Sequence, residues 1–265
     1  MGSAMLHGWL NDPGISADFA IVEPNQDALS WTKSYANATL FVNCAAAAAA
    51  ANRPSQMVVL AVKPQMMDGA IASLTGVADS STAFLSIAAG IPTKWFTTRL
   101  PKSGDGSAAL VLRSMPNTPA AIGKGITALY AANAPAAIVT LATQLLAAVG
   151  QVVTIDDENL MDAITAVSGS GPAYVFLLAE TMTAAGIEAG LPPKLAKQLA
   201  EVTVTGTGEL IAASDDPLAK LRLNVTSKGG TTAAALAVLM GEDGLAPLME
   251  RAILAARDRS IELGS

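Results

Sequence analysis

The chain has 265 residues, of which 51% are hydrophobic and 14% are charged, with a formal net charge of −6 and a sequence pI near 4.8. This length and hydrophobic fraction allow a large buried core in one large or two medium-sized domains. The excess of acidic residues leaves no basic surface to bind phosphates, and only 4% of the residues are aromatic and could stack on bases. Both observations argue against a nucleic-acid partner.

The residues available for chemistry are few. Cys44 is the only cysteine and His7 the only histidine, so an intrachain disulfide is excluded and a Cys/His zinc site is not expected. We expect His7 to be a packed or solvated side chain rather than a catalyst, because no partner is identifiable for it. The most apolar long segment, residues 136–149, is shorter than the roughly 20 residues that span a bilayer. No targeting signal is visible, so we expect a cytoplasmic protein without a membrane partner.

Up to about residue 155, short apolar strands alternate with helices. The spacing predicts strands over residues 19–22, 39–42, 57–62, 83–88, 109–114, 126–130 and 151–155, and helices over residues 2–10, 23–35, 45–51 and 134–149, with a further helix after residue 64. Continuous apolar strands that alternate with helices are typical of a parallel sheet covered on both faces. We therefore expect an α/β fold with a doubly wound, mostly parallel sheet of the Rossmann type.

From Asp156 onward the strand signal disappears. Helical spacing runs over residues 171–188, 193–213, 231–240 and 245–263, with breaks at Gly-Leu-Pro-Pro (190–193) and Asp-Asp-Pro (215–217). The sequence thus predicts a first domain of residues 1–155 and an all-helical second domain of residues 156–265.

The predicted strands end at short turns of small residues. These turns are Glu23, residues 61–64, 87–90 and 115–119, and ligands of open parallel sheets bind at this edge. Four such turns favour a dinucleotide, although each alone could be a tight turn without a ligand. Glu23 stands 21 positions after Gly2, close to the roughly 20-residue spacing of a ribose-binding acid that favours NAD over NADP. It could equally be an acid in the first turn of a helix.

The segment Val225–Thr232 places hydroxyls and glycines directly before the apolar run 233–240. One interpretation is that Thr226, Ser227 and Thr231 simply cap a helix. The other is that backbone N–H groups and hydroxyls converge at the helix N-terminus and bind a small carboxylate.

Five segments together resemble pyrroline-5-carboxylate reductase, and in order they cover essentially the whole chain. They are Met1-Gly2-Ser3-Ala4-Met5, Leu60-Ala61-Val62-Lys63-Pro64, Arg113-Ser114-Met115-Pro116-Asn117-Thr118-Pro119, Ser168-Gly169-Ser170-Gly171-Pro172-Ala173-Tyr174 and Val225–Thr232. The resemblance implies an oxidoreductase that reduces 1-pyrroline-5-carboxylate to L-proline with NADPH or NADH, the last step of proline biosynthesis. It also implies a homodimer or a ring of dimers joined through the helical domain, whose alanine-rich helices have more apolar surface than a small domain needs.

The resemblance further implies two sets of site residues. The cofactor would lie on Gly2, Glu23, Ala61, Val62, Lys63, Pro64, Ile87, Ala88, Ala89 and Asn117. The substrate would lie on Glu158, Asn224, Ser227, Gly230, Thr231 and Thr232. Thr232 is the candidate catalytic residue, with a hydrogen bond to the ring nitrogen, and no strong general acid is needed if the iminium form binds. For Glu158, an acid at a helix N-terminus is the alternative.

The sequence departs from the family pattern at its start and at Lys228, where a proline is frequent. The family opens with a strand and a Gly-x-Gly-x-Met-Gly turn, whereas this sequence begins at the Met of that turn. We expect an incomplete pyrophosphate site and a sheet with two exposed edges where a central strand is missing.

Two other functions fit parts of the pattern. A non-catalytic descendant would keep the oligomerising helices and use the nucleotide domain as a scaffold or regulator, and it would bind neither NADH nor NADPH. A 2-hydroxyacid-type dehydrogenase could share the architecture, but the helical domain contains neither a catalytic histidine nor a lysine-centred active-site motif.

Overall fold

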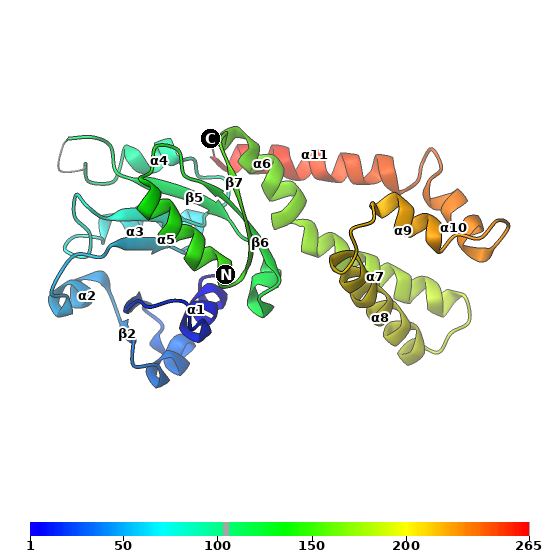
Figure 1. Ribbon diagram of the computed structural model, residues 1–265, viewed down its shortest axis with the longest axis horizontal. Helices are drawn as coiled ribbons and strands as arrows, with labels where there is room; N and C mark the ends of the chain where they lie inside the picture. Colours follow the sequence, from blue (N-terminus) through cyan, green and yellow to red (C-terminus); the bar gives the residue numbers. More distant parts are fainter. Residues whose placement is uncertain (103–105, 265) are drawn as a thin grey trace. The chain divides into compact units, whose positions relative to one another are not determined.

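The computed structural model describes residues 1–102 and 106–264 and contains two compact units (Figure 1). The first unit comprises Met1–Gly169 together with the residues from Arg257 onward, and the second comprises Ser170–Ala256. These units differ from the predicted segments 1–155 and 156–265, because residues 156–169 and the end of the last helix pack with the sheet. The functional division at Asp156 stays a prediction.

A five-stranded sheet forms the centre of the first unit. Its order is β3 (Met57–Leu60), β4 (Ala83–Ser86), β5 (Val111–Met115), β6 (Gly125–Tyr130) and β7 (Gly150–Ile155). The pairs β3–β4, β4–β5 and β6–β7 are parallel, and β5–β6 is antiparallel. The sheet is therefore mostly parallel, as the sequence predicts.

The first two strands form a sheet of their own. β1 (Phe19–Val22) and β2 (Ala38–Phe41) pair in parallel, with Phe19 opposite Ala38. Neither β1 nor β3 hydrogen-bonds to a further strand of the described chain, so both are edge strands. This agrees with the expected pair of exposed edges.

Helices cover both faces of the five-stranded sheet. Successive side chains of a strand point to opposite faces, so neighbouring residues of one strand belong to two different cores. Phe84 and Val111 pack with α2 (Cys44–Ala50), α3 (Met67–Ala72) and α4 (Thr93–Thr97) in one core. Their neighbours Leu85 and Leu112 pack with α1 (Gly2–Asn11) and α5 (Ala136–Ala147) in the other. The fold is thus the doubly wound α/β arrangement.

Trp9 joins the elements of the second of these cores. Its indole N–H donates a hydrogen bond of 2.6 Å to the Leu145 carbonyl of α5, and its ring stacks on Phe19 of β1 at 5.7 Å between centroids. A buried tryptophan needs such a polar partner for its N–H. α1 is therefore anchored to α5 and to β1.

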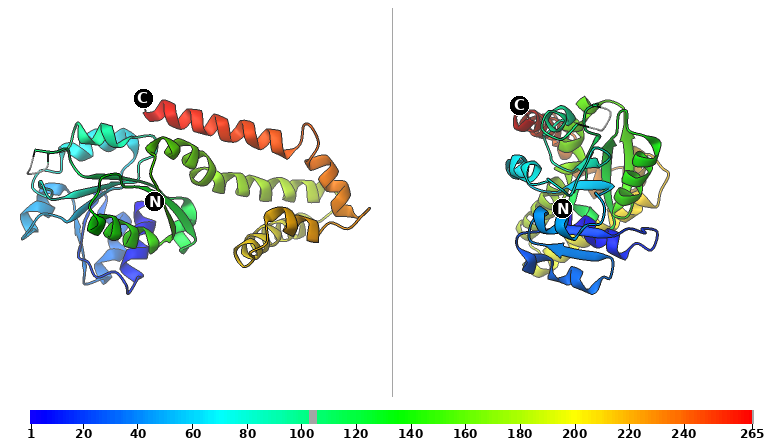
Figure 2. Two further views of the ribbon diagram at one scale, coloured as in Figure 1. Left: turned by 45° about the horizontal axis from the view of Figure 1, so that its top comes forward. Right: turned by 90° about the vertical axis from the view of Figure 1, so that its left-hand side faces the viewer.

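The second unit contains helices alone, and its boundaries follow the proline and glycine signals. It comprises α7 (Gly171–Glu188), α8 (Pro193–Ala212), α9 (Leu218–Asn224), α10 (Thr231–Leu239) and the first part of α11 (Leu245–Gly264). α7 and α8 form a hairpin of neighbouring helices (Figures 1 and 2). In the described chain, no helix is both long and apolar enough to cross a membrane.

Several local predictions were wrong. Residues 26–34 form a 3₁₀ helix, η1 (Gln26–Ser34), in place of an α-helix, and Leu29 interrupts it with φ −120°. The strands predicted to reach Val62 and Ala88 end at Leu60 and Ser86. The short helices α4, α6 (Met161–Ile164) and α9 have no sequence-based counterpart, because elements of four to seven residues show too little periodicity.

Gly150 supplies the sharpest test of this packing. It adopts φ +144°, and a β-carbon there would overlap the backbone of Gly125 on the neighbouring strand. Gly150→Ala should therefore lower the free energy of unfolding by about 2 to 4 kcal/mol. The control, Gly69→Ala in α3, has open space around the new methyl group and should stabilise by up to about 1 kcal/mol. Urea denaturation measures both; equal stability of the two variants would contradict this account.

Candidate functional site

Several predicted cofactor residues, among them Gly2, Ala61 and Ile87, lie close together at the carboxyl ends of β3 and β4. The start of α1 lies against the turn after β3, since a β-carbon on Gly2 would come within 2.9 Å of the Ala61 β-carbon. The backbone N–H of Ile87, just after β4, donates to the Leu60 carbonyl at 3.3 Å. The first helical bond of α1 runs from Met5 to Met1, so the N–H groups of residues 2–4 have no partner within the helix. Such a helix start suits a phosphate.

Small side chains and short turns line this rim. Val62 and Lys63 lead into η2 (Pro64–Met66), and the Lys63 side chain is exposed. Ala88 donates its backbone N–H to the Ser86 hydroxyl at 3.2 Å, which holds the turn that continues to Ala89. The rim can therefore be approached closely by a flat molecule, and the residues fit a dinucleotide.

Glu23 stands directly after β1. Its backbone N–H donates to the Phe41 carbonyl at 3.0 Å, and its Oε1 accepts the N–H of Asn25 at 2.8 Å. The half-buried carboxylate thus shapes its own turn at the position predicted for a ribose-binding acid.

Asn117 has a structural task that the sequence did not predict. Its side-chain amide donates to the Ser168 carbonyl at 3.2 Å, and its Oδ1 accepts the N–H of Ile126 at 3.0 Å. The residue is buried and ties three segments of the first unit together. A role in cofactor binding stays a prediction.

Glu158 is held by groups of the first unit. Its Oε1 accepts the Thr93 N–H at 2.7 Å and the Arg113 Nη1 at 3.1 Å, while Oε2 accepts the Thr93 hydroxyl at 2.6 Å. Thr93 opens α4, so the carboxylate caps that helix instead of its own element η4 (Glu158–Leu160). Glu158 therefore caps α4 rather than the start of its own helical segment, where Asp157 is the side-chain cap, and the substrate role of Glu158 stays a prediction.

Arg113 is the buried cation of this cluster, and sequence reasoning missed it. Arg113 is 3% exposed, and its Nη2 lies 4.0 Å from Asp162 Oδ1. Its Nε and Nη2 atoms have no hydrogen-bond partner. Asp162 in turn accepts the Ser260 hydroxyl of α11 at 2.6 Å. The available signal was a lone arginine at the end of an apolar strand, a residue type that is almost never buried without a partner.

The loop before α10 turns sharply into the helix without a side-chain cap. Gly229 adopts φ +72°, and the Gly230 N–H donates to the Ser227 carbonyl at 3.0 Å. Gly230 is the N-cap, and no side chain caps the helix. The interpretation of the loop as a simple side-chain cap is therefore wrong.

Donor groups at this helix start are unused. The Ala234 N–H bonds to the Gly230 carbonyl, so the N–H groups of residues 231–233 have no partner within the helix. In the described part of the chain, no hydrogen bond engages the hydroxyls of Ser227, Thr231 or Thr232. Asn224 ends α9 close by in sequence, and Lys228 is exposed in the loop. The start of α10 thus combines N–H groups that are unpaired within the helix with hydroxyls that no hydrogen bond of the described chain engages, and its role in binding a carboxylate stays a prediction.

Across residues 1–102 and 106–264, no three His, Cys, Asp or Glu side chains are arranged to hold a metal ion. The cofactor rim and Glu158 belong to the first unit, and the loop before α10 belongs to the second.

Comparison with known proteins adds a consistent result. The family described as pyrroline-5-carboxylate reductase dimerisation matches residues 158–263. The pyrroline-5-carboxylate reductase of Haemophilus influenzae is 37% identical over 265 residues, which cover 99% of this chain and 94% of that protein. The Synechocystis enzyme of the same name is 45% identical over 212 residues, covering 79% of this chain and 76% of the relative.

Solved structures agree. A pyrroline-5-carboxylate reductase from Coxiella burnetii superposes with a TM-score of 0.85 at 30% identity, over 100% of this chain and 95% of the other. The Plasmodium falciparum pyrroline carboxylate reductase, a structure with NADP bound, superposes with a TM-score of 0.80 at 28% identity, over 100% and 95% of the two chains.

The contribution of Arg113, with its partners Glu158 and Asp162, to the stability of the fold can be measured. Arg113→Met should lower the free energy of unfolding by about 2 to 4 kcal/mol, because Glu158 and Asp162 lose their cation in a partly dry site. Arg259→Met removes an exposed ion pair with Glu262 and should change stability by less than about 1 kcal/mol. Thermal and urea denaturation report both values. If the two variants lose the same stability, Arg113 has no special place in the fold.

Proposed function

Because the chain belongs to the pyrroline-5-carboxylate reductase family, we propose that it reduces 1-pyrroline-5-carboxylate to L-proline at the loop before α10, with NADPH or NADH as hydride donor. The observation that carries this proposal is the uncapped start of α10. Backbone N–H groups there are unpaired within the helix, and the hydroxyls beside them are not used for capping.

The substrate carboxylate is the group that this loop suits. The N–H groups of residues 231–233 and the helix dipole favour a negative charge, and Lys228 adds a positive one. A β-carbon on Gly230 would overlap the Ser227 hydroxyl, which would have to rotate away. Ser227, Gly230 and Thr231 are therefore proposed to hold the carboxylate, with Asn224 at the edge.

Thr232 is proposed to bind the ring nitrogen. Its side chain is half-buried, and its hydroxyl can accept a hydrogen bond from the N–H of the iminium form. Hydride addition to the imine carbon then leaves a neutral secondary amine, so charge balances without a general acid. This agrees with a chain whose one histidine, His7, lies in α1 beside Trp31.

The cofactor, when bound, supplies the hydride. We propose that Gly2 and the free N–H groups of α1 hold a phosphate, that Glu23 contacts a ribose, and that the small residues of the turns after β3 and β4 admit the rest of the molecule. The unpaired N–H groups at the start of α1 and the close approach of Gly2 to Ala61 support this assignment.

Replacing Thr232 tests the proposed catalytic contact. Thr232→Ala should lower kcat by about 10- to 100-fold, because the hydrogen bond to the reacting nitrogen is lost, while the Kd of NADPH or NADH stays unchanged. Thr232→Ser should restore most of the rate, since the hydroxyl remains.

Thr207→Ala is the matched control, because that exposed hydroxyl only donates to the Thr203 carbonyl within α8. Steady-state kinetics and cofactor titration give the two readouts. A normal kcat for Thr232→Ala would remove Thr232 from the reaction.

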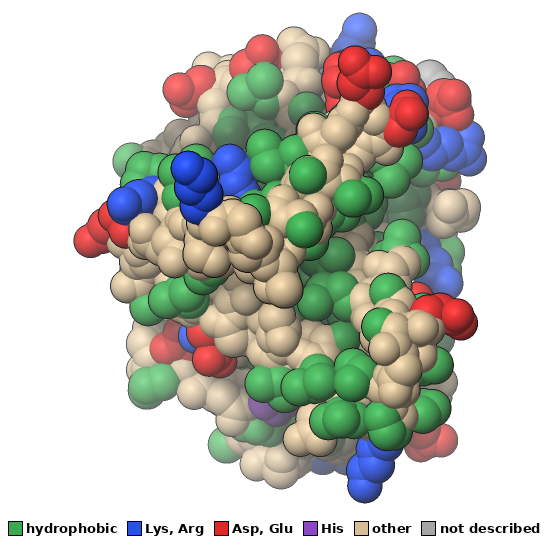
Figure 3. Space-filling view, turned by 90° about the vertical axis from the view of Figure 1, so that its right-hand side faces the viewer, with side chains coloured by type: hydrophobic (Ala, Val, Ile, Leu, Met, Phe, Trp, Pro, Cys, Tyr) green, Lys and Arg blue, Asp and Glu red, His purple; other side chains and the backbone are tan. Residues whose placement is uncertain are grey.

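We also propose that the helical unit pairs with a second copy. Within residues 170–256, all described, Ala196 and Ala200 alone are buried, whereas large apolar side chains such as Phe176, Val202 and Val238 are mostly exposed. The view from the side of α8 to α10 shows hydrophobic side chains across much of the surface (Figure 3). Monomeric proteins rarely expose so much apolar surface. The match to a dimerisation family supports a homodimer or a ring of dimers.

The sedimentation velocity of the chain should therefore be that of a dimer or larger at micromolar concentration. Phe176→Glu, at a position 64% exposed on α7, should shift the protein toward monomer, because a buried carboxylate opposes association. Met66→Glu, at a position 60% exposed in the first unit, is the control and should leave the state unchanged. A monomeric unmodified chain would overturn the proposal.

A further inference from the structure

The turn that follows β4 is covered by the last turn of α11, although the two segments are far apart in the sequence. Gly90 in this turn is buried and adopts φ +78°. A β-carbon on Gly90 would come within 3.1 Å of the Leu263 β-carbon and 3.2 Å of the Ser260 carbonyl oxygen. A β-carbon on Gly264 would in turn overlap the Gly90 carbonyl oxygen. The two backbone segments, both part of the first unit, are therefore in direct contact.

Ser260 fixes this part of α11 in the first unit. The residue is 4% exposed, and its hydroxyl donates a hydrogen bond of 2.6 Å to Asp162 Oδ1. A hydrogen bond to a carboxylate is about twice as strong as one between neutral groups. Asp162 also lies 4.0 Å from the Arg113 guanidinium, so the last turn of α11 is tied to the buried ion-pair cluster.

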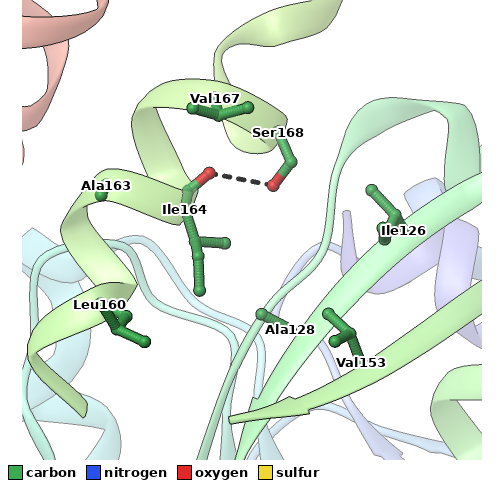
Figure 4. Close-up of a pocket in the computed structure, with 8 residues that line it drawn as sticks. All are labelled: Ile126, Ala128, Val153, Leu160, Ala163, Ile164, Val167 and Ser168. Carbon is green, nitrogen blue, oxygen red and sulfur yellow. Dashed lines mark hydrogen bonds between the residues drawn. The ribbon is translucent and has the colours of Figure 1, made fainter. Parts of the chain in front are cut away.

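The helix α6, which carries Asp162, has two sides with different contacts. Leu160 and Ile164 line a cavity of about 360 Å³ together with residues of β6 and β7 (Figure 4). Two residues span about 200° of a helix, so Asp162 lies on the other side, where it meets Ser260. The Ser168 hydroxyl donates to the Ile164 carbonyl at 3.0 Å and stays within this helical segment (Figure 4). The Ser260 hydroxyl, in contrast, links the segment to α11.

The turn after β4 is also held at both of its ends. At the β4 end, the Ala88 N–H donates to the Ser86 hydroxyl at 3.2 Å. At the α4 end, Glu158 accepts the N–H of Thr93 at 2.7 Å and its hydroxyl at 2.6 Å. The contact with α11 lies between these two anchors, at Gly90. The position of the middle of the turn therefore depends on the last turn of α11.

We infer that the last turn of α11 positions the turn after β4 for the cofactor. This inference rests on the proposed function, in which Ile87, Ala88 and Ala89 admit the dinucleotide. A turn that is already held in place before binding loses less conformational freedom when the cofactor binds, so the affinity is higher. Gly90 and Ser260 are thus positioning residues, which act through the turn and not through a contact with the cofactor.

Gly90→Ala and Gly123→Ala separate this contact from backbone strain. Both glycines have a positive φ, +78° and +69°, so alanine is strained at both positions. The new methyl group meets α11 at Gly90 and open space at Gly123. Gly90→Ala should raise the Kd of NADPH or NADH about 3- to 10-fold and keep kcat at saturating cofactor within about twofold. Gly123→Ala should change neither, and circular dichroism melting measures the stability that each variant loses.

Ser260→Ala removes the second anchor without adding a group. It should raise the cofactor Kd about 2- to 5-fold, because the bond to Asp162 is lost and the end of α11 is held less firmly. Thr140→Ala is the control, since that exposed hydroxyl only donates to the Ala136 carbonyl within α5 of the same unit. If folded Gly90→Ala and folded Ser260→Ala both bind the cofactor as the unmodified chain does, the inference is overturned.

Hydrogen exchange of the unmodified chain tests the same coupling if the variants fail to fold. Because coupling between two sites is reciprocal, cofactor binding should slow amide exchange in residues 258–264, which lie outside the proposed cofactor site. The expected slowing is at least about 3-fold relative to α5. Exchange that slows in residues 87–89 but stays unchanged in residues 258–264 contradicts the inference and leaves the proposed function standing. A chain that binds neither cofactor rejects both.

Discussion

The backbone N–H groups at the start of α10 are the feature on which the proposed chemistry depends. A helix with glycine at the N-cap, as Gly230 is here, gives up roughly a few tenths of a kcal/mol relative to a side-chain cap. Here the loop has three hydroxyl residues within reach in sequence, and none of them caps the helix. A helix start left open in this way is suited to a ligand that brings its own negative charge.

The first unit uses the same physical device at another place. The start of α1 lies against the small-residue turn after β3, and its first N–H groups are likewise unpaired within the helix. Around it, the tightly bonded groups are structural: Asn117 joins three segments, and Glu158 and Arg113 lock α4 to β5. Buried ion pairs and hydrogen bonds thus hold the scaffold, and we propose that the open helix starts bind the anionic groups of the ligands.

The parts of the fold that could be predicted are those whose signals lie within a few consecutive residues of the sequence. Alternating apolar strands and helices, the Gly-Leu-Pro-Pro break and the hydroxyl-glycine loop are each visible within a few residues. The Arg113–Glu158 pair joins residues 45 positions apart, so no local pattern could reveal it. Whether a hydroxyl of Thr226–Thr232 caps the helix also depended on side-chain orientation, which composition does not specify. η1 was misjudged because the dihedral angles of Leu29 interrupt a sequence that otherwise permits a helix.

The measurement that tests this account most directly is the oxidation of NADPH and NADH by the 265-residue chain with 1-pyrroline-5-carboxylate as substrate, with binding of both cofactors measured in parallel. We expect that at least one cofactor binds and is oxidised only when the substrate is present, with L-proline formed in equal amount. A folded chain that binds neither cofactor, or binds one without forming proline, would contradict the proposed reductase activity and favour a non-catalytic oligomeric role.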